Sequence, residues 1–319
     1  MTYARIAGIG SFLPEKVVTN RDLEKTMDTS DEWIRERTGI KRRHIAADDE
    51  TTSSMGLIAA QRAMQMAGVG PDDIDLIIVG TATPDKAFPA TACTIQRQLG
   101  IEGCPAFDLS AACTGFIYGL DVANRFIVSG GAKTAIVIGA ETLSRIVDWE
   151  DRGTAVLFGD GAGAVVLKAG DEPGILATHI HADGQYEDLL HVEERASAVT
   201  ATRGTYIAME GNAVFRRAVA TFDNIARETI ADVDGHLDDI DWFVPHQANM
   251  RIIKAAAKKL KMPMERVIAT VDEQANTSAA SIPLALDLAI RDGRIQRGQT
   301  LLLAAFGAGF TWGSAMLKY

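Results

Sequence analysis

The sequence predicts an α/β fold built from two similar halves. Three apolar runs, LIIVG at 76–80, AIVIGA at 135–140 and LLLAAF at 301–306, show no alternation with polar residues. Strands of this kind lie in sheets that are covered on both faces. The chain has 319 residues, which is long for a single domain, and its second half repeats the element order of its first. We therefore expect two related halves rather than two unrelated domains.

Four pairs of segments carry the internal repeat. Each pair shares an apolar run or a small-residue turn in the same order along the chain. The paired segments are 72–80 with 238–246, 106–130 with 269–293, 134–141 with 300–307, and 158–168 with 306–318. In the second pair, both members are expected to run from a strand through a turn into a helix. The repeat predicts an N-terminal half at 1–170 and a C-terminal half at 171–319, joined near residues 169–174.

The helix that follows the cysteine at position 113 is expected to lie between two sheets. Residues 113–129 carry Phe116, Leu120, Val122 and Ile127, which are apolar on several sides of a helix. Residues 183–206 have weak periodicity and many polar side chains, so we expect a surface excursion there.

Composition excludes several classes of function. The net charge of −10 argues against a general nucleic-acid binder, and no apolar run approaches the roughly 18 residues of a membrane helix. Three cysteines without a CxxC pair argue against structural zinc. The odd number of cysteines and the lack of a signal peptide predict reduced thiols in a cytoplasmic protein. The GDGAG stretch at 159–163 is followed by an apolar run, so it is a weak candidate for a dinucleotide loop.

Cys113 is the first candidate for catalysis. It lies in DLSAACTGF at 108–116, where a strand is expected to turn into a helix. A helix N-terminus lowers the pKa of a thiol, and small neighbours leave room for a substrate and for backbone N–H groups. The repeat places Asn276 almost opposite Cys113, and His246 ends a repeated strand. Because ligand sites gather at such strand ends, the three side chains are expected to meet in one pocket.

Each of these residues also has an ordinary structural interpretation. Free cysteines are commonly buried and inert, which is the interpretation we favour for Cys93 and Cys104 and an open alternative for Cys113. His246 taken alone is a core or surface histidine, and Asn276 taken alone is a turn residue. The spacing of His179 and His181 suits two metal ligands on a strand, but no carboxylate is obvious nearby, so no metal site is predicted.

Six motifs resemble the thiolase superfamily, and within it the β-ketoacyl-acyl-carrier-protein synthase III family. Together they extend over nearly the whole chain in the family's order, which is stronger evidence than any one motif. They are TSDEWIRERTGIKRRHIA at 29–46, AACTGF at 111–116, DRGTAVLFGDGAGA at 151–164, VPHQANMRII at 244–253, NTSAASIP at 276–283 and FGAGFTWGSA at 306–315. The resemblance implies a thiolase-like fold with αβαβα layers and two halves related by a pseudo-twofold axis.

The resemblance also implies a reaction and its catalytic residues. Cys113, His246 and Asn276 match a Cys-His-Asn triad, and the backbone N–H groups of Cys113 and Ala308 match an oxyanion hole. The thiolate would take an acyl group from a short acyl-CoA. Malonyl-acyl carrier protein would then lose CO₂ and its carbanion would attack the acyl-enzyme, giving a 3-oxoacyl carrier protein. No cofactor is implied, since acyl-CoA is a substrate.

Further contacts follow from the family's motifs. The CoA contacts fall on Thr29, Trp33, Arg37, Arg152, Gly211, Phe215, Ala248, Asn249 and Phe306. Trp33 is suited to stack on adenine, with two arginine forks for phosphates. Phe88 matches a residue that reaches the acyl pocket of a partner subunit, which implies a homodimer. The acidic carrier protein is expected to dock on Gln247, Ala248, Asn249, Met250, Arg251, Lys254, Lys258, Lys259 and Arg216, with Lys261 on the same helix face as Arg251, Lys254 and Lys258 and with Arg217 nearby. A basic helix face of this kind is otherwise an ordinary solvated surface.

Two positions depart from the family's pattern. Residues 272–275 read DEQA where a more basic, glycine-containing stretch is common, and Ala308 stands where glycine is common. Both put the choice of acyl primer in question. Condensation of a different primer or acceptor in a specialised pathway is therefore the nearest alternative. A hydrolase would need a second base, and a non-catalytic acyl-binding protein would not need the triad.

Overall fold

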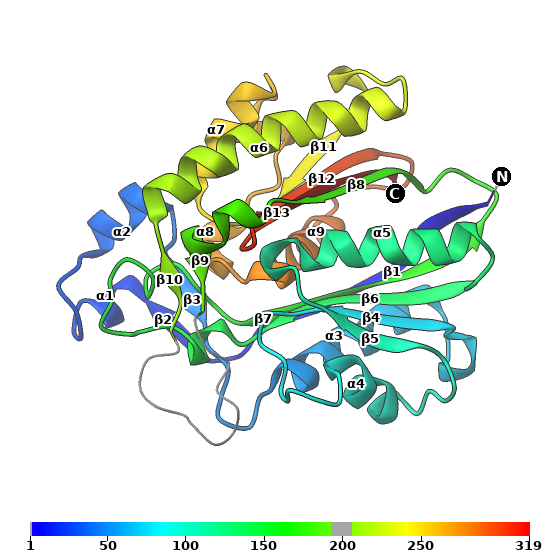
Figure 1. The fold of residues 1–319 in the computed structure, drawn as a ribbon, viewed down its shortest axis with the longest axis horizontal. Helices are drawn as coiled ribbons and strands as arrows, with labels where there is room; N and C mark the ends of the chain where they lie inside the picture. Colours follow the sequence, from blue (N-terminus) through cyan, green and yellow to red (C-terminus); the bar gives the residue numbers. More distant parts are fainter. Residues whose placement is uncertain (1, 193–205) are drawn as a thin grey trace.

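The computed structural model of the chain contains two large β-sheets with helices between and outside them, and two short two-stranded sheets, β2-β3 and β9-β10 (Figure 1). It describes residues 2–192 and 206–319. The first sheet has five strands in the order β1 (Tyr3–Phe12), β7 (Gly161–Gly170), β6 (Thr134–Glu141), β4 (Leu76–Gly80) and β5 (Ala106–Leu109). The second has four strands in the order β8 (Ile175–Ala182), β13 (Thr311–Lys318), β12 (Thr300–Gly307) and β11 (Trp242–Pro245). All residues of β4 and β6 are buried, as their apolar runs predicted.

Helices form three further layers around the sheets. The middle layer holds α5 (Gly115–Val128) and α9 (Ser281–Arg291), and α5 packs on β4 and β6 of one sheet and on β8 and β13 of the other. On the outer faces lie α3 (Thr52–Ala67) and α4 (Thr91–Leu99) on one side, and α6 (Gly211–Asp232) and α7 (Met250–Lys259) on the other. The predicted αβαβα order and the predicted sandwiched helix are confirmed.

The two sheets share one topology, which confirms the internal repeat. Four strands recur in the same order, as β1-β7-β6-β4 in the first sheet and β8-β13-β12-β11 in the second. In each set the first three strands are antiparallel to their neighbours, and the fourth is parallel to the third. The remaining short elements connect these layers. They are β2 (Val17–Thr19), α1 (Asn20–Leu23), α2 (Asp31–Thr38), β3 (Arg42–His44), η1 (Pro71–Asp73), η3 (Leu143–Arg145), η5 (Leu237–Asp239) and η6 (Met264–Arg266).

The strand predicted at the start of residues 269–293 is wrong. Opposite β5, the second sheet has only an isolated bridge between Phe243 and Val267, and the chain then forms the short helix α8 (Val271–Gln274). The side chain of Gln247 explains the difference. Its Oε1 accepts from the backbone N–H groups of Thr270 and Val271, so these groups bond to an amide instead of a neighbouring strand.

The boundary between the halves falls between two strands. β7 ends at Gly170 and β8 begins at Ile175. Because α5 packs on the second sheet and α9 packs on β1 and β7, the two halves share their middle layer. A division into domains at 169–174 stays a prediction.

The predicted surface excursion at 183–206 is only partly described. Its first part forms η4 (Gly184–Leu189) and β9 (Leu190–His191), and β9 pairs with β10 (Ala208–Met209). Residues 193–205 lie outside the described residues. In the part of the chain that the structure covers, no helix combines the length and apolarity that crossing a membrane requires.

Equivalent turns open the two middle helices. The turn η2 (Ala112–Thr114) precedes α5, and η7 (Ser278–Ala280) precedes α9. The first residue of each turn has a positive φ, 44° at Ala112 and 49° at Ser278. By this register Cys113 corresponds to Ala279. The expected pairing of Cys113 with Asn276 is therefore wrong by three residues, and Asn276 lies just before the second turn.

Glycines let these turns touch the ends of the strands. A Cβ on Gly139, in β6, would lie 2.2 Å from the carbonyl oxygen of Ala279. A Cβ on Gly80, at the end of β4, would lie 2.5 Å from the carbonyl carbon of Gly115. Since real Cβ atoms do not approach backbone this closely, only glycine permits both contacts. The two turns are thereby held against the strand ends where the candidate site is expected.

Candidate active site

Cys113 lies in the turn η2, between the end of the second sheet and the other turn. Its side chain is 7% exposed. The turn packs against β12 and against η7. A Cβ on Gly307, the last residue of β12, would lie 2.8 Å from the backbone nitrogen of Cys113. The thiol and its own N–H group are therefore placed directly beside the loop that follows β12.

His246 is positioned by the strand next to β12. It follows β11, and its N–H donates to the carbonyl of Ala304 at 2.8 Å. Its Nδ1 lies 2.7 Å from the hydroxyl of Ser281, the first residue of α9, and its ring meets that of Phe306 edge-on at 5.5 Å. Burial lowers the pKa of His246 to about 3. The imidazole is thus neutral at physiological pH, with one nitrogen fixed and the other turned away from Ser281.

Asn276 is held by three backbone contacts just before η7. Its N–H donates to Leu157 at 2.9 Å, and its carbonyl accepts from Gly159 at 3.0 Å. The side-chain Oδ1 accepts from the N–H of Ser278 at 2.9 Å. With its oxygen occupied, the side chain presents its amide nitrogen as a donor. The three predicted catalytic residues thus lie on η2, after β11 and before η7; η2 packs against η7, and His246 contacts Ser281, which follows η7.

Glu141 is a buried acid that sequence reasoning missed. It ends β6 with no exposed surface. Its carboxylate accepts from the N–H of Ala82, from the hydroxyl of Thr83 at 2.6 Å and from the hydroxyl of Ser278 at 3.0 Å. Ser278 in turn forms a hydrogen bond with Cys113. A lone acid at the end of the apolar run TAIVIGAE was the available signal.

The pKa of the thiol departs from expectation. The position of Cys113 at a helix N-terminus predicted a lowered thiol pKa. Burial instead raises the pKa of Cys113 to about 12. The hydrogen bond between Ser278 and Cys113 opposes this rise, and the negative charge of Glu141 adds to it. The direction of this shift is opposite to the lowered pKa that was expected, and desolvation by burial is its largest cause. The resting site holds a neutral thiol beside a neutral imidazole.

Ala308 lies in the turn between β12 and β13, which is the position predicted for the second oxyanion donor. Its φ is not positive, whereas the next residue, Gly309, has a φ of 132°. The backbone at Ala308 therefore accommodates a Cβ, and the departure from glycine leaves its N–H in place. Its carbonyl accepts from the hydroxyl of Thr311 at 3.0 Å, which fixes the turn.

Comparisons with known proteins agree on one family. Models described as 3-oxoacyl-[acyl-carrier-protein] synthase III and as its C-terminal part match residues 107–184 and 230–319. A protein named β-ketoacyl-[acyl-carrier-protein] synthase III from Thioalkalivibrio sulfidiphilus is 61% identical and covers 100% of both chains. The namesake from Xanthomonas campestris is 59% identical over 99% of this chain and 98% of its own.

This chain belongs to the β-ketoacyl-acyl-carrier-protein synthase III family. The crystal structure of the 3-oxoacyl-[acyl-carrier-protein] synthase III of Aquifex aeolicus matches with a TM-score of 0.95 at 49% identity, covering 99% of this chain and 100% of that one. The resemblance drawn from the motifs and the thiolase-like fold are both confirmed. The chain is accordingly an acyltransferase of the condensing type that initiates fatty acid synthesis.

One cluster of predicted CoA contacts forms around α2. The guanidinium carbons of Arg37 and Arg152 lie 4.8 and 5.0 Å from the centre of the Trp33 ring. Arg152 also donates to the carbonyl of Asp28 at 2.9 Å. The hydroxyl of Thr29 is buried and makes no hydrogen bond within the described residues. An aromatic ring, two cations and an unpaired hydroxyl are thus gathered at one place.

The other predicted CoA contacts lie on the second half. Gly211 begins α6, and Phe215 one turn later lies 5.4 Å from the guanidinium carbon of Arg251. Asn249 caps α7, where its Oδ1 accepts from Ile252 at 2.9 Å. Ala248 and Phe306 are buried, so they line the interior and not the surface.

The predicted carrier-protein surface needs two corrections. Gln247 is completely buried and bonds only to backbone groups, so it holds the loop before α7 and offers no docking contact. Arg217 turns away from α7, 3.8 Å from the ring of Tyr186 and 3.5 Å from a carboxylate oxygen of Asp183. The remaining cations are exposed on α7, just after it or on α6: Arg251, Lys254, Lys258, Lys259, Lys261 and Arg216.

Two further predicted features lie at the surface. Phe88 is 86% exposed, which is unusual for a phenylalanine. The acidic stretch before Asn276 forms ion pairs with the first residue of β3 and the residue before it: Lys41 lies 2.7 Å from Asp272, and Arg42 lies 2.9 Å from Glu273. The departure at 272–275 is thus matched by basic residues at the start of β3.

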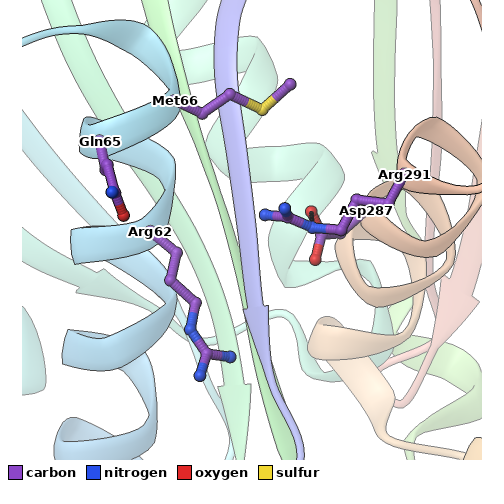
Figure 2. A pocket seen from close by; sticks show the side chains of 5 residues that line it. All are labelled: Arg62, Gln65, Met66, Asp287 and Arg291. Atoms are coloured by element: carbon purple, nitrogen blue, oxygen red, sulfur yellow. Dashed lines mark hydrogen bonds and ion pairs between the residues drawn. The ribbon is translucent and has the colours of Figure 1, made fainter.

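A surface hollow lies away from the cysteine. It is lined by Arg62, Gln65 and Met66 of α3 and by Asp287 and Arg291 of α9, on either side of β1 (Figure 2). Arg291 binds Asp287 at 2.7 Å. A second hollow is lined by Thr19, Asn20, Arg21, Asp31, Arg35, Lys41 and Arg42. Neither hollow includes a triad residue among its lining.

Glu141→Gln tests the ionisation of the buried acid. Burial raises the pKa of Glu141 from 4.5 to about 7. Between these values the unfolded chain has lost the proton and the folded chain has kept it, so stability falls as pH rises through this window. Glutamine lacks this fall. The free energy of unfolding of the variant minus that of the wild type should therefore increase from pH 4.5 to 7, by on the order of 3 kcal/mol.

Urea unfolding at several pH values measures this difference. His246, whose pKa is lowered, contributes the opposite slope below pH 6.5, but it does so in both proteins and cancels. A difference that stays constant between pH 4.5 and 8 would contradict the raised pKa of Glu141.

Proposed function

We propose that the chain condenses a short acyl-CoA, acetyl-CoA first among them, with malonyl-acyl carrier protein. The products are a 3-oxoacyl carrier protein, CoA and CO₂. One observation carries the assignment of residues: Cys113 sits against Gly307 on a buried turn, with His246 and Asn276 on the adjoining elements. The names of relatives at 61% and 59% identity support the choice of substrates.

In the first step the sulfur of Cys113 adds to the thioester carbon of acyl-CoA. The carbonyl oxygen becomes an oxyanion that accepts from the N–H groups of Cys113 and Ala308. The C–S bond to CoA then breaks, and the proton of the Cys113 thiol ends on the sulfur of CoA. The burial that raises the pKa of Cys113 also keeps water away from the acyl-enzyme.

In the second step malonyl carrier protein loses CO₂ and becomes an enolate. The hydroxyl oxygen of Ser281 accepts from the N–H of Gln247, so its own proton is directed at Nδ1 of His246. We therefore assign the proton of His246 to Nε2. That N–H and the amide of Asn276 would donate to the enolate oxygen. The carbanion attacks the acyl carbon, the C–S bond to Cys113 breaks, and the thiolate takes up a proton. No metal or cofactor is needed to balance either step.

The CoA end of the substrate would bind at α2. Trp33 offers a face for adenine, Arg37 and Arg152 are close enough to the ring to bind phosphate beside it, and the hydroxyl of Thr29 lacks a partner among the described residues. Phe88, exposed in the single chain, would be covered by a second copy in a homodimer. A cytoplasmic location suits these soluble substrates.

The alternative is a different acyl primer, and the experiment must distinguish it from acetyl-CoA. The crystal structure of the priming β-ketosynthase of the R1128 polyketide pathway matches with a TM-score of 0.95, although the two sequences are 38% identical. The same fold therefore occurs in priming enzymes of different pathways. Acylation by a panel of acyl-CoAs distinguishes them, because the panel reads the primer directly.

Cys113→Ser should abolish the acyl-enzyme. Serine lacks the nucleophilic thiol, so incubation with acetyl-CoA should add no acetyl mass, whereas the wild type gains one acetyl group per chain. Intact-protein mass spectrometry measures both, and Cys93→Ser should behave as the wild type. An acetyl adduct that persists on Cys113→Ser would refute the nucleophile. Preference for longer or branched acyl groups in the panel would favour the specialised pathway.

His246→Ala and Asn276→Ala should damage the second half-reaction more than the first. Each change removes one donor to the enolate, and losing such a donor typically costs about 10²–10³-fold in rate. Release of labelled CO₂ from malonyl carrier protein should fall by this factor, while acylation of Cys113 falls much less. Equal losses in the two half-reactions would contradict the assignment of both residues to the enolate.

The exposed basic face of α7 is proposed to bind the carrier protein. Lys254 and Lys258 are exposed and, in residues 2–192 and 206–319, form no ion pair. Arg251 is less suitable for a test, because it contacts Phe215, a proposed CoA residue. On a chain with a net charge of −10, a local positive surface would steer an acidic partner at low salt.

Lys254→Glu with Lys258→Glu should raise KM for malonyl carrier protein roughly tenfold at low salt. Acylation by acetyl-CoA should stay unchanged, because neither lysine is among the predicted CoA contacts. Lys133→Glu with Lys168→Glu is a matched control, since it makes the same change of charge elsewhere. These two lysines lie at the end of β6 and β7 that is opposite to Glu141. The effect should shrink at high salt. An unchanged KM, or an equal rise in the control, would exclude α7 as the docking surface.

A further inference from the structure

Two histidines and two carboxylates meet between β8 and α6. His179 and His181 alternate along β8 and so lie on the same face of the strand. Glu228 and Asp232 are one turn apart on α6, which packs on this strand (Figure 1). The sequence suggested the histidine pair but showed no carboxylate near it. The fold supplies one, because Glu228 is 47 positions from His181 along the chain.

The distances place three ligand atoms around one point. Nε2 of His181 is 3.0 Å from Oε2 of Glu228, and Nδ1 of His179 is 3.4 Å from Oε1 of the same carboxylate. One ligand atom from each residue can be chosen so that all lie within 4.8 Å of one another. The two rings are nearly parallel, with an angle of 6° and centres 6.4 Å apart. Four-coordinate Zn²⁺ with ligands at about 2.0–2.2 Å needs ligand atoms closer together than this, so binding would require rotamer changes that draw the side chains inward.

Asp232 has the position of a supporting residue. Its Oδ2 lies 3.5 Å from Nε2 of His179, the nitrogen opposite the one that faces Glu228. That Nε2 is buried and makes no hydrogen bond within the described residues. Histidines that bind a metal through one nitrogen usually donate from the other to a carboxylate. Binding through Nδ1 would therefore give Nε2–H a partner in Asp232.

Charge favours a cation over an unoccupied cluster. In the part of the chain that the structure describes, the ion pairs of Glu228 and Asp232 are made with these histidines alone. When the imidazoles are neutral, the carboxylates of Glu228 and Asp232 lie in one cluster with no Lys or Arg ion-paired to either of them in the described residues. Glu228 and His181 are partly exposed, so a cation can enter from solvent.

We propose that His179, His181 and Glu228 bind one Zn²⁺ or similar divalent transition-metal ion, with Asp232 orienting His179. Two imidazoles and one carboxylate, with a water in the fourth position, form a known ligand set for Zn²⁺. The ion would join β8, the edge strand of the second sheet, to α6 of the outer layer. This site is separate from the condensing site, and its occupancy is independent of the proposed reaction.

Isothermal titration with ZnCl₂ after treatment with a chelator tests the site. The titration uses Cys113→Ser as the parent, so that the active-site thiol cannot take up zinc. The parent should bind one Zn²⁺ per chain and should unfold at a higher temperature with zinc than without it. His179→Asn, His181→Asn and Glu228→Gln should each weaken binding at least tenfold, and Asp232→Asn about tenfold, on the same background.

His236→Asn is the matched control, because it removes an exposed histidine elsewhere on the surface. It should bind zinc as the parent does. Glu228→Gln also guards against misfolding, since Glu228 is partly exposed and its variant should unfold like the zinc-free parent. If the parent shows no saturable uptake, the residues form an ion-pair cluster only and the proposal is wrong. Equal uptake by the parent and by Glu228→Gln would likewise overturn it.

Discussion

The close contact of two turns with the ends of three strands is the constraint on which the site depends. Gly139, Gly80 and Gly307 stand where a Cβ would lie 2.2–2.8 Å from backbone atoms of η7, α5 and η2. These contacts fix the turns against both sheets. Cys113 and Asn276 flank the contacts, and His246 follows the strand next to Gly307. The geometry of the triad is therefore set by backbone packing before any side chain of the triad is considered.

Burial then decides the protonation of the resting site. It raises the pKa of Cys113 to about 12 and of Glu141 to about 7, and it lowers that of His246 to about 3. All three shifts disfavour charge, which is what a dry site does to isolated ions. The resting enzyme thus stores no thiolate. In the proposed reaction, negative charge develops on substrate oxygens, and on the sulfur of Cys113 when its bond to the acyl group breaks, in a site that excludes water.

Much of this was predictable, because the strongest sequence signals come from burial on both faces of a sheet. Continuous apolar runs placed β4, β6 and β12, and the repeat indicated that both halves share one topology. The predicted strand near residue 269 failed because Gln247, a side chain distant from it, bonds to its backbone N–H groups. Glu141 was missed because a single acid after an apolar run looks like a strand end at the surface. Contacts between distant side chains leave no local pattern.

The register of the repeat shows how two similar halves came to hold different chemistry. Ala112 and Ser278 begin equivalent turns with the same unusual backbone. In the first half the next residue is Cys113, the proposed nucleophile, and in the second it is Ala279, whose carbonyl packs on Gly139. Ser278 instead bonds to Cys113 and to Glu141. The second turn therefore supports the first, so symmetry of the backbone coexists with a single reactive centre between the halves.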